Sequence, residues 1–304
     1  MFFGIFNRRT FPKVSLLLLG FVLFSANTAY FLGADQASLK TPLQKTYHFD
    51  YENVRKKTPY LNLKAALLVN YDNGEVLYAK NYNKVRPIAS ISKLVAAMVV
   101  IDKGVDLDKT EKITRKDARR SRRSRLRIGY VLTLRDLLHA ALMNSDNRAC
   151  KALARATSGS IENFVRDMNR KVKKLGLKNT IFYDPTGLDK RNVSTAEEVA
   201  KILHYAFEYD LIAKITSKKK HIAKIRNSKK GFLRFANTNR LVLSPYKVLA
   251  GKTGYIIASD YCLATLVKNS RGERLTLVVL GVPGDKLRFR EARRILAWGF
   301  RCLS

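Results

Sequence analysis

Residues 88–101 read IASISKLVAAMVVI, an apolar run in which Lys93 is the one charged residue. Such a run is typical of a buried helix, and we expect this helix to begin near Ser90. Ser90 and Lys93 are three residues apart, so their side chains share one face of the helix. Burial of an ammonium group is costly without a partner, and it lowers the pKa of lysine towards that of a usable base. Taken alone, the pair could also be a capping serine beside a lysine that reaches the surface.

The segments around this run predict a sheet and further helices. Residues 65–70 and 75–80 flank Asp72-Asn73-Gly74, a signal for a hairpin, because Asn-Gly tolerates the positive φ of tight turns. Helices are predicted to begin at Thr133 and Ser194, each followed three residues later by an acidic residue. Three β-rich runs and a closing helix follow, at 248–253, 261–268, 274–282 and 291–300. The sheet should therefore be built from both ends of the chain, with a helical middle part inserted.

Two further short motifs carry polar chemistry. Ser145 and Asn147 lie in a short segment that interrupts two apolar helical stretches, where an ordinary helix cap is the simpler explanation. Lys252-Thr253-Gly254 closes a β-rich run; a cation and a hydroxyl suit a carboxylate, and glycine lets a ligand backbone approach the strand edge. It could equally be a strand followed by a turn glycine. The Ser-x-x-Lys spacing is itself weak, because it recurs at Ser217 and Ser244.

The order of the three motifs is more informative than any one of them. Ser-x-x-Lys at Ser90, Ser-x-Asn at Ser145 and Lys-Thr-Gly at Lys252 follow the pattern of the serine penicillin-recognising enzymes. Over roughly residues 55–303 the chain resembles low-molecular-mass penicillin-binding proteins of the D-alanyl-D-alanine carboxypeptidase and endopeptidase family. The stretches that carry the resemblance are RPIASISK (86–93), DPTGL (184–188), NVSTA (192–196) and GKTGY (251–255).

The resemblance implies an α/β fold of the beta-lactamase and DD-peptidase type. Its antiparallel sheet would be flanked by the Ser90 helix and the C-terminal helix, and an all-helical lobe would be inserted. We expect the α/β lobe to comprise residues 55–105 and 235–303, and the mainly helical lobe to comprise residues 106–234. The site should lie between the two lobes.

The resemblance also implies a role for each motif residue. Ser90 would attack the carbonyl between two D-alanines, Lys93 would accept its proton, and Ser145 would pass a proton to the leaving amine. The substrate would be held by Asn147, Lys252, Thr253 and Gly254, and the N–H groups of Ser90 and Tyr255 would form the oxyanion hole. The implied partners are peptidoglycan stem peptides, with beta-lactams as covalent inhibitors, and no metal or organic cofactor is required. A lysine base leaves His139 a structural residue.

Two enzyme alternatives stay open at this point. Class A beta-lactamases share the three motifs but add a Glu-x-x-Leu-Asn stretch for deacylation, and residues 148–251 contain none. Slow deacylation of penicillin is therefore expected. Within the peptidase family, the end of the chain soon after Phe300 and the segment Ser124-Arg125-Leu126-Arg127 look more like the endopeptidase-type members, although carboxypeptidases can also lack a second domain.

The net charge raises a hypothesis of another class. Lys and Arg number 58 against 24 Asp and Glu, with dense basic runs at 115–127 and 214–234. Composition alone would allow a nucleic-acid binder. The absence of a recognised nucleic-acid motif, the ordered catalytic motifs and an export pattern near the N-terminus argue against one. Solvated faces, or attraction to anionic wall, outer-membrane or peptide carboxylate groups of the cell envelope, explain the charge better. A non-catalytic wall-binding protein is the remaining alternative. The three cysteines, 150, 262 and 302, allow at most one disulfide and offer no metal site.

The N-terminal region predicts export. Arg8, Arg9 and Lys13 precede an apolar run at 14–24, the pattern of a secretory signal. We expect residues 1–29 to be a signal peptide, or else a retained N-terminal anchor, and residues 30–54 to be a linker. The protein would then be periplasmic or attached to the cell envelope.

Overall fold

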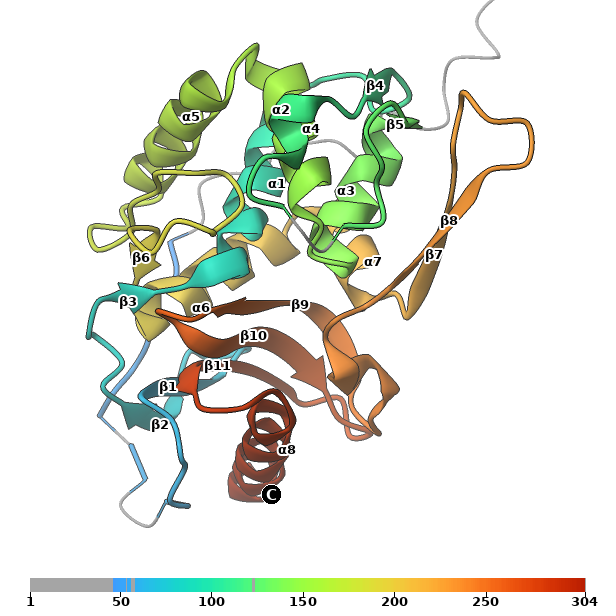
Figure 1. The fold of residues 1–304 in the computed structure, drawn as a ribbon. Coiled ribbons are helices and arrows are strands. Elements are labelled where there is room, and N and C mark those ends of the chain that lie inside the picture. Colours follow the sequence, from blue (N-terminus) through green and yellow to red (C-terminus); the bar gives the residue numbers. More distant parts are fainter. Residues whose placement is uncertain (1–45, 53, 56–57, 122–123, 304) are drawn as a thin grey trace, which may run out of the picture. The chain divides into compact units, whose positions relative to one another are not determined.

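A computed structural model describes residues 46–303 apart from 53, 56–57 and 122–123 (Figure 1). The predicted export signal at 14–24 lies outside these residues. Among the helices of the described part, none is both long enough and apolar enough to span a bilayer.

A five-stranded antiparallel sheet forms the centre of the fold, in the order β2-β1-β11-β10-β9. The first two strands come from the N-terminal part of the described chain and the other three from its C-terminal part, which confirms a sheet built from both ends. In β1, Leu67 faces one apolar core and Leu68 the other, so both faces of this central strand are buried. The strands are β1 (Ala65–Asn70), β2 (Val76–Lys80), β9 (Lys247–Ile256), β10 (Asp260–Lys268) and β11 (Arg274–Val282).

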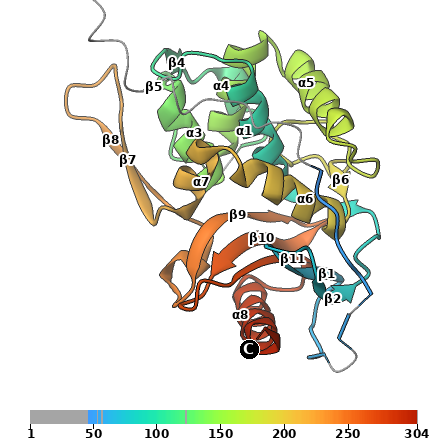
Figure 2. The same cartoon turned by 180° about the vertical axis from the view of Figure 1, so that it is seen from behind.

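Helices cover both faces of this sheet, as Figures 1 and 2 show. Helix α8 (Asp285–Cys302) packs Phe289 and Ile295 against one face. On the other face lies α6 (Ala196–Phe207), which contacts β1, β9, β10 and β11. These two layers give the predicted α/β architecture of a sheet flanked by helices.

The helix after Ser90 was expected to flank the sheet, but it does not lie on it. The Ser90 segment meets β9 and β10 through the 3-10 turn η2 (Ala89–Ser92), whereas α1 (Lys93–Asp102) packs mainly among other helices. Every residue of α1 except its last is buried. A helix that is apolar all round needs partners on all sides, and a flat sheet covers only one. The partners of α1 are α3 (Leu134–Met143), α4 (Asn147–Ser158), α5 (Ile161–Lys174), α6 and α7 (Asp210–Ser217).

Several predicted boundaries shift by a few residues. Helix α3 begins after Thr133 as predicted, with the threonine hydroxyl accepting the Asp136 N–H at 3.1 Å. The cap of α6 is Thr195 and not Ser194, because the Thr195 hydroxyl accepts the Glu198 N–H. The last helix starts at Asp285, six residues before the predicted start at 291. Strand β9 continues through Lys252-Thr253-Gly254 to Ile256, so this motif lies within a strand and not at its end.

A hairpin in the second basic run was not predicted. Strands β7 (Lys220–Lys224) and β8 (Phe232–Ala236) pair antiparallel there, hidden in the sequence by abundant lysine. The short elements that complete the described chain are β3 (Arg86–Pro87), β4 (Thr110–Lys112), α2 (Arg115–Ala118), β5 (Val131–Thr133), β6 (Val193–Ser194) and η3 (Arg240–Leu243).

Candidate active site

Ser90 is held in a crowded backbone turn. Ala89 before it has φ 47°, a conformation that side-chain-bearing residues seldom adopt. A Cβ added at Gly187 would lie 1.9 Å from the Ala89 carbonyl oxygen, and one added at Gly254 would lie 2.8 Å from the Ile88 carbonyl oxygen. The loop containing Gly187 and the strand containing Gly254 therefore press against the serine turn, and both contacts need glycine. At Gly254 the close neighbour is this chain's own backbone, in place of the ligand backbone expected there.

Lys93 is fully buried behind Ser90. Its Nζ donates to Ser90 Oγ at 2.8 Å, to Asn147 Oδ1 at 2.7 Å and to the Thr186 carbonyl oxygen at 2.7 Å. Burial lowers the pKa of Lys93 below its usual value, while the carboxylates Asp184 and Asp146 oppose that shift. The predicted Ser–Lys pair is therefore a direct contact inside the protein, and the reading of Lys93 as a lysine that reaches the surface does not apply.

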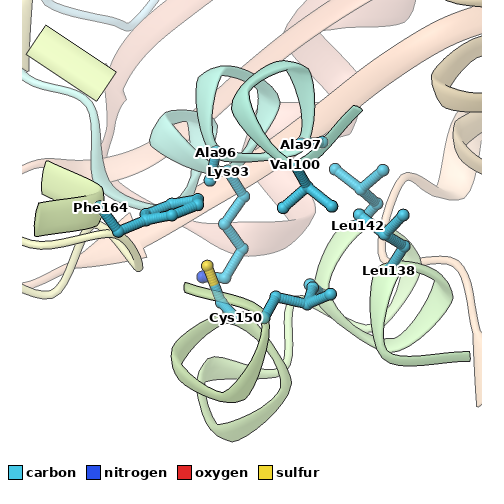
Figure 3. Close-up of a pocket in the computed structure, with 10 residues that line it drawn as sticks. Lys93, Ala96, Ala97, Val100, Leu138, Leu142, Cys150 and Phe164 are labelled. Carbon is cyan, nitrogen blue, oxygen red and sulfur yellow. The ribbon is translucent and has the colours of Figure 1, made fainter. Parts of the chain in front are cut away.

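An apolar pocket explains the loss of solvation at Lys93 (Figure 3). The stem of Lys93 and the Cys150 thiol face each other across it, and Phe164 closes one side. The Cys150 thiol donates to the Pro185 carbonyl oxygen at 3.1 Å, and burial raises the pKa of this thiol to about 12. All three cysteines are free thiols, so Cys150 is a protonated neighbour of Lys93 and not part of a disulfide.

Ser145 and Lys252 form a second Ser–Lys pair across the site. Lys252, from the middle of β9, donates to Ser145 Oγ at 2.9 Å and to the Thr253 carbonyl oxygen at 2.8 Å. Ser145 has φ 58°, so the short connection between α3 and α4 bends sharply at this residue. Burial, and then the charges of Lys93 and Arg288, lower the pKa of Lys252 well below its usual value.

The strand edge next to Lys252 is polar and partly open. Thr253 Oγ1 lies 2.6 Å from Thr238 Oγ1, and Tyr255 is 47% exposed with its ring stacked on Tyr261 at 4.2 Å. Arg288 of α8 reaches under the strand and donates to the Gly254 carbonyl oxygen at 3.1 Å. The edge thus places the Thr253 hydroxyl and the Lys252 side chain near Ser90, an arrangement that suits a carboxylate.

The structure brings all three motifs to one place. Ser90 and Lys93 come from η2 and α1, Ser145 from the α3–α4 connection, Asn147 from the first turn of α4, and Lys252 from β9. Asn147 is linked to the first motif through Lys93, and Ser145 to the third through Lys252. The hydrogen bonds join residues that are 54 and 107 positions apart in the sequence.

Sequence reasoning missed the contribution of the DPTGL segment to this site. The Thr186 carbonyl oxygen accepts from Lys93 and from the Ser90 hydroxyl, the latter at 3.3 Å. Asp184 shapes the loop by accepting the N–H groups of Thr186 at 3.1 Å and Gly187 at 3.0 Å. The segment carried part of the family resemblance, but a backbone carbonyl has no signature of its own in a sequence.

Asn192 and Ser92 lock this loop onto the serine turn. The Asn192 amide donates to Ser92 Oγ at 3.2 Å and to the Asp184 carbonyl oxygen at 2.8 Å, and Ser92 Oγ donates to the Ala89 carbonyl oxygen at 2.8 Å. Both side chains are fully buried. This network is the physical reason for the second serine in the Ser-Ile-Ser-Lys stretch.

The site defines a class of enzyme before any relative is considered. A half-buried serine hydroxyl in direct contact with a desolvated lysine can act as a nucleophile with its base, and a second Ser–Lys pair beside it can hold an anion. The geometry is that of a serine acyl-enzyme hydrolase with a lysine base.

Comparison with known proteins gives the family. The family model described as D-alanyl-D-alanine carboxypeptidase matches residues 52–284, and the chain belongs to this family of serine DD-peptidases. Over 239 residues it is 36% identical to a D-alanyl-D-alanine endopeptidase of Escherichia coli, covering 77% of this chain and 76% of that one. It is 33% identical to the D-alanyl-D-alanine carboxypeptidase DacF of Bacillus subtilis, covering 78% and 62%.

Solved structures confirm the fold. A variant of the Streptomyces K15 DD-transpeptidase superposes with a TM-score of 0.75 at 25% identity, covering 80% of this chain and 100% of that one. Penicillin binding protein 5 of Haemophilus influenzae superposes with a TM-score of 0.72 at 30% identity, covering 81% and 72%. The predicted beta-lactamase and DD-peptidase type of fold is therefore confirmed.

Proposed function

We propose that this protein cleaves the bond between two D-alanyl-type residues of peptidoglycan stem peptides through an acyl-enzyme at Ser90. The observation that carries the assignment is the 2.8 Å contact between Ser90 Oγ and the buried Lys93 Nζ. Serine is a weak nucleophile unless a base takes its proton, and Lys93 is the buried base in contact with it.

The surroundings of Lys93 fit an uncharged amine. A neutral amine has two N–H groups and one lone pair, and the structure offers it two carbonyl-type acceptors, Asn147 Oδ1 and the Thr186 oxygen, plus the Ser90 hydroxyl. In the charged form Nζ donates to all three oxygens. In the neutral form the two carbonyl-type oxygens would keep the N–H groups, and the Ser90 hydroxyl would turn from the Thr186 oxygen to donate to the lone pair of Nζ. As the bond from Oγ to the substrate carbonyl carbon forms, the proton moves to Lys93.

The remaining steps use the second Ser–Lys pair and the strand edge. The oxyanion would lie between the N–H groups of Ser90 and Tyr255. As the peptide bond breaks, Ser145 would pass on to the departing amine the proton that Lys93 took from Ser90, so that Ser145 keeps its hydroxyl and Lys93 is neutral again. Lys252 and Thr253 hold the carboxylate of the leaving residue. Water then hydrolyses the ester at Ser90, and beta-lactams, whose ring amide mimics the scissile bond, acylate the same serine.

The cellular setting is part of the same proposal. Export by residues 1–29, as a cleaved signal or a retained anchor, would bring the enzyme to the periplasm or cell envelope, where its polymeric substrate is found. Residues 30–54 would be a linker, followed by a catalytic unit at 55–303 with an α/β lobe (55–105, 235–303) and a mainly helical lobe (106–234). The basic surface would favour an anionic envelope component.

The choice between carboxypeptidase and endopeptidase activity is testable by product mass. Both kinds of enzyme occur among the relatives of this chain. We favour the endopeptidase, since the endopeptidases of Escherichia coli and Pseudomonas aeruginosa are each 36% identical to this chain, against 33% for DacF. Purified peptidoglycan fragments incubated with the enzyme should then show crosslinked dimers split into monomers, while loss of one terminal alanine would identify a carboxypeptidase.

Labelling with a fluorescent penicillin tests the nucleophile. After peptide mapping, the label should lie on the Ser90 peptide, and Ser90→Ala should remove it. Ser217→Ala is the matched control, because Ser217 also precedes a lysine by three residues but bonds to the Ala213 carbonyl oxygen within α7. Undiminished labelling of Ser90→Ala, or loss of label in Ser217→Ala, would overturn the assignment.

A further inference from the structure

The β7–β8 hairpin has two faces of opposite character. On its inner face Ala223 and Phe235 are buried in the main core, and the His221 ring stacks on His139 at 3.7 Å between centroids. His221 Nε2 also lies 2.7 Å from Asp136 Oδ1. This face attaches the hairpin firmly to α3, so the orientation of its other face is fixed.

The outer face combines cations with large apolar side chains. Lys220, Ile222 and Lys224 alternate along β7, and Phe232 and Arg234 along β8, and all five are exposed. Ile222 is 54% exposed and Phe232 59%. The register places Ile222 opposite Arg234 and Lys224 opposite Phe232, so each apolar side chain is paired across the hairpin with a cation.

Further positive charge surrounds this face. The tip between the strands adds Arg226, Lys229 and Lys230, and residues 214–234 contain no acidic residue. Arg125, from the other basic run, donates to the Arg234 carbonyl oxygen at 2.7 Å. Two runs that are separate in the sequence thus meet at one edge of the molecule.

We propose that the outer face of the β7–β8 hairpin docks on an anionic phospholipid bilayer. Anionic headgroups attract lysine and arginine, and the apolar stems of these residues can lie along the interface while their charges stay in the headgroup layer. Between them, Ile222 and Phe232 enter the apolar layer beneath. A soluble polyanion would use the cations alone and would leave two large apolar side chains in water.

The hairpin also leads directly into the active site. Immediately after β8, the Thr238 N–H donates to the Met143 carbonyl oxygen at 2.9 Å, and Thr238 Oγ1 contacts Thr253 Oγ1. Docking of this face would therefore hold the active site at a defined place beside the bilayer. The proposal concerns where the enzyme acts and does not depend on which peptide bond it cleaves.

A tryptophan reporter tests the proposal in the full-length protein. Phe232→Trp is combined with Trp298→Phe, which removes the chain's one natural tryptophan. With phosphatidylglycerol vesicles, emission of the introduced tryptophan should move to shorter wavelength and should be quenched by lipids brominated in their acyl chains. Leu243→Trp in the same background is the control, since Leu243 is 71% exposed in η3, away from the hairpin face. Absence of bromolipid quenching at position 232, or equal quenching at position 243, overturns the proposal.

Charge variants test the electrostatic part. In one variant Lys220, Lys224 and Arg234 are all changed to Gln, and binding to phosphatidylglycerol vesicles is followed by quenching of the same reporter. The affinity should fall about 100-fold, because each cation near such a surface contributes about fivefold. Lys173, Lys174 and Lys178, exposed at and just after the end of α5, give a control with equal loss of charge on the other side of the helical layer (Figures 1 and 2). Equal losses in both triple variants would mean that net charge, and not this face, binds the lipid.

The apolar pair separates a bilayer from other polyanions. Ile222→Ser with Phe232→Ser should weaken binding to phosphatidylglycerol vesicles, measured by co-sedimentation against the Leu243→Ser control, and leave binding to a DNA oligonucleotide unchanged. Unchanged vesicle binding, or weakened DNA binding in its place, would identify a polyanion surface and overturn the bilayer. Penicillin acylation at the wild-type rate shows that each variant is folded.

Discussion

The two buried Ser–Lys pairs of this site are alike in composition and differ in how their charge is balanced. Lys93 has three oxygen partners and is close to the carboxylates Asp184 and Asp146. Lys252 has two oxygen partners, Ser145 Oγ and the Thr253 carbonyl oxygen, and its pKa is lowered by the charge of Arg288 and by that of Lys93 whenever Lys93 is protonated. Among the described residues, carboxylates act on the pKa of Lys93, whereas none is among the groups that shift the pKa of Lys252.

The difference supports the proposed division of roles, with Lys93 in proton transfer and Lys252 in substrate binding. Lys93 is enclosed by carbonyl-type oxygens and an apolar pocket, so it can lose and regain a proton without exposure to water. Lys252 lies on a strand edge beside Thr253, where a substrate carboxylate would supply the missing negative charge. A carboxylate at Lys252 would also raise its lowered pKa, so binding should favour the charged form of this lysine.

Removal of Lys93 should have the largest effect. Lys93→Ala should slow acylation by penicillin about 10³- to 10⁴-fold at every substrate concentration, because the general base is gone. The rate of acylation is measured with a labelled penicillin, by stopped flow or on gels. Lys220→Ala is the matched control, with the same spacing after a serine but on the exposed hairpin face. Acylation of Lys93→Ala at the wild-type rate would contradict the role of base.

Gly187→Ala should come next, because it disturbs the oxygen that Lys93 shares with Ser90. The new Cβ would overlap the Ala89 carbonyl, and the φ of 80° is unfavourable for alanine. We expect the free energy of unfolding to fall by about 2 to 5 kcal/mol and acylation to slow about 100-fold as the serine turn shifts.

Gly176→Ala separates the two contributions to that loss. Gly176 has a similar φ of 71°, but no atom lies within 4 Å of an added Cβ. This variant should lose only about 1 to 2 kcal/mol of unfolding free energy and keep full acylation. Equal behaviour of the two variants in urea unfolding and labelling would show that the loop does not press on the serine turn.

Lys252→Ala should have a smaller and different effect. Loss of a charged hydrogen bond to the substrate carboxylate is worth about 1.5 to 3 kcal/mol, or roughly 10- to 150-fold in kcat/KM. A peptide with its terminal carboxylate converted to an amide should lose much less on mutation. Lys247→Ala, at the exposed start of the same strand, is the control. An equal loss for acid and amide substrates would move Lys252 from binding into proton transfer.

The pH dependence should show the smallest effect and divide the pairs again. Lys93 acts as a base only when unprotonated, and burial lowers its pKa, so acylation should rise with pH through that lowered pKa and not through the usual value for lysine. Lys252 holds a carboxylate only when protonated, so acid substrates should lose affinity at higher pH. Rates with acid and amide peptides over the same pH range test both. A rise that begins only near the pKa of free lysine would contradict a neutral Lys93.

Much of the site was predictable from local pattern. The apolar run after Ser90 indicated burial of Lys93, and the order of the three motifs indicated that Ser145 and Lys252 belong to the same site. The hairpin at Asp72-Asn73-Gly74 and the cap at Thr133 were also correct, because turns and caps depend on a few neighbouring residues.

The tertiary structure decided what depends on long-range contact. Three features of the site join groups about 100 positions apart in the sequence: the Thr186 carbonyl at Lys93, the hydrogen bond between Asn192 and Ser92, and the crowding at Gly187. The first and third involve backbone atoms, which carry no sequence signature. Helix α1 packs among other helices because it is apolar on all sides. In the sequence this property is visible only as a continuous run of apolar residues. The β7–β8 hairpin was not predicted because the many lysines on its outer face made the segment look like a basic run. They hid the alternation of exposed and buried residues that is typical of strands. The sequence by itself determined which side chains are chemically able to act, and the packing of distant segments decided how each one is charged, oriented and exposed.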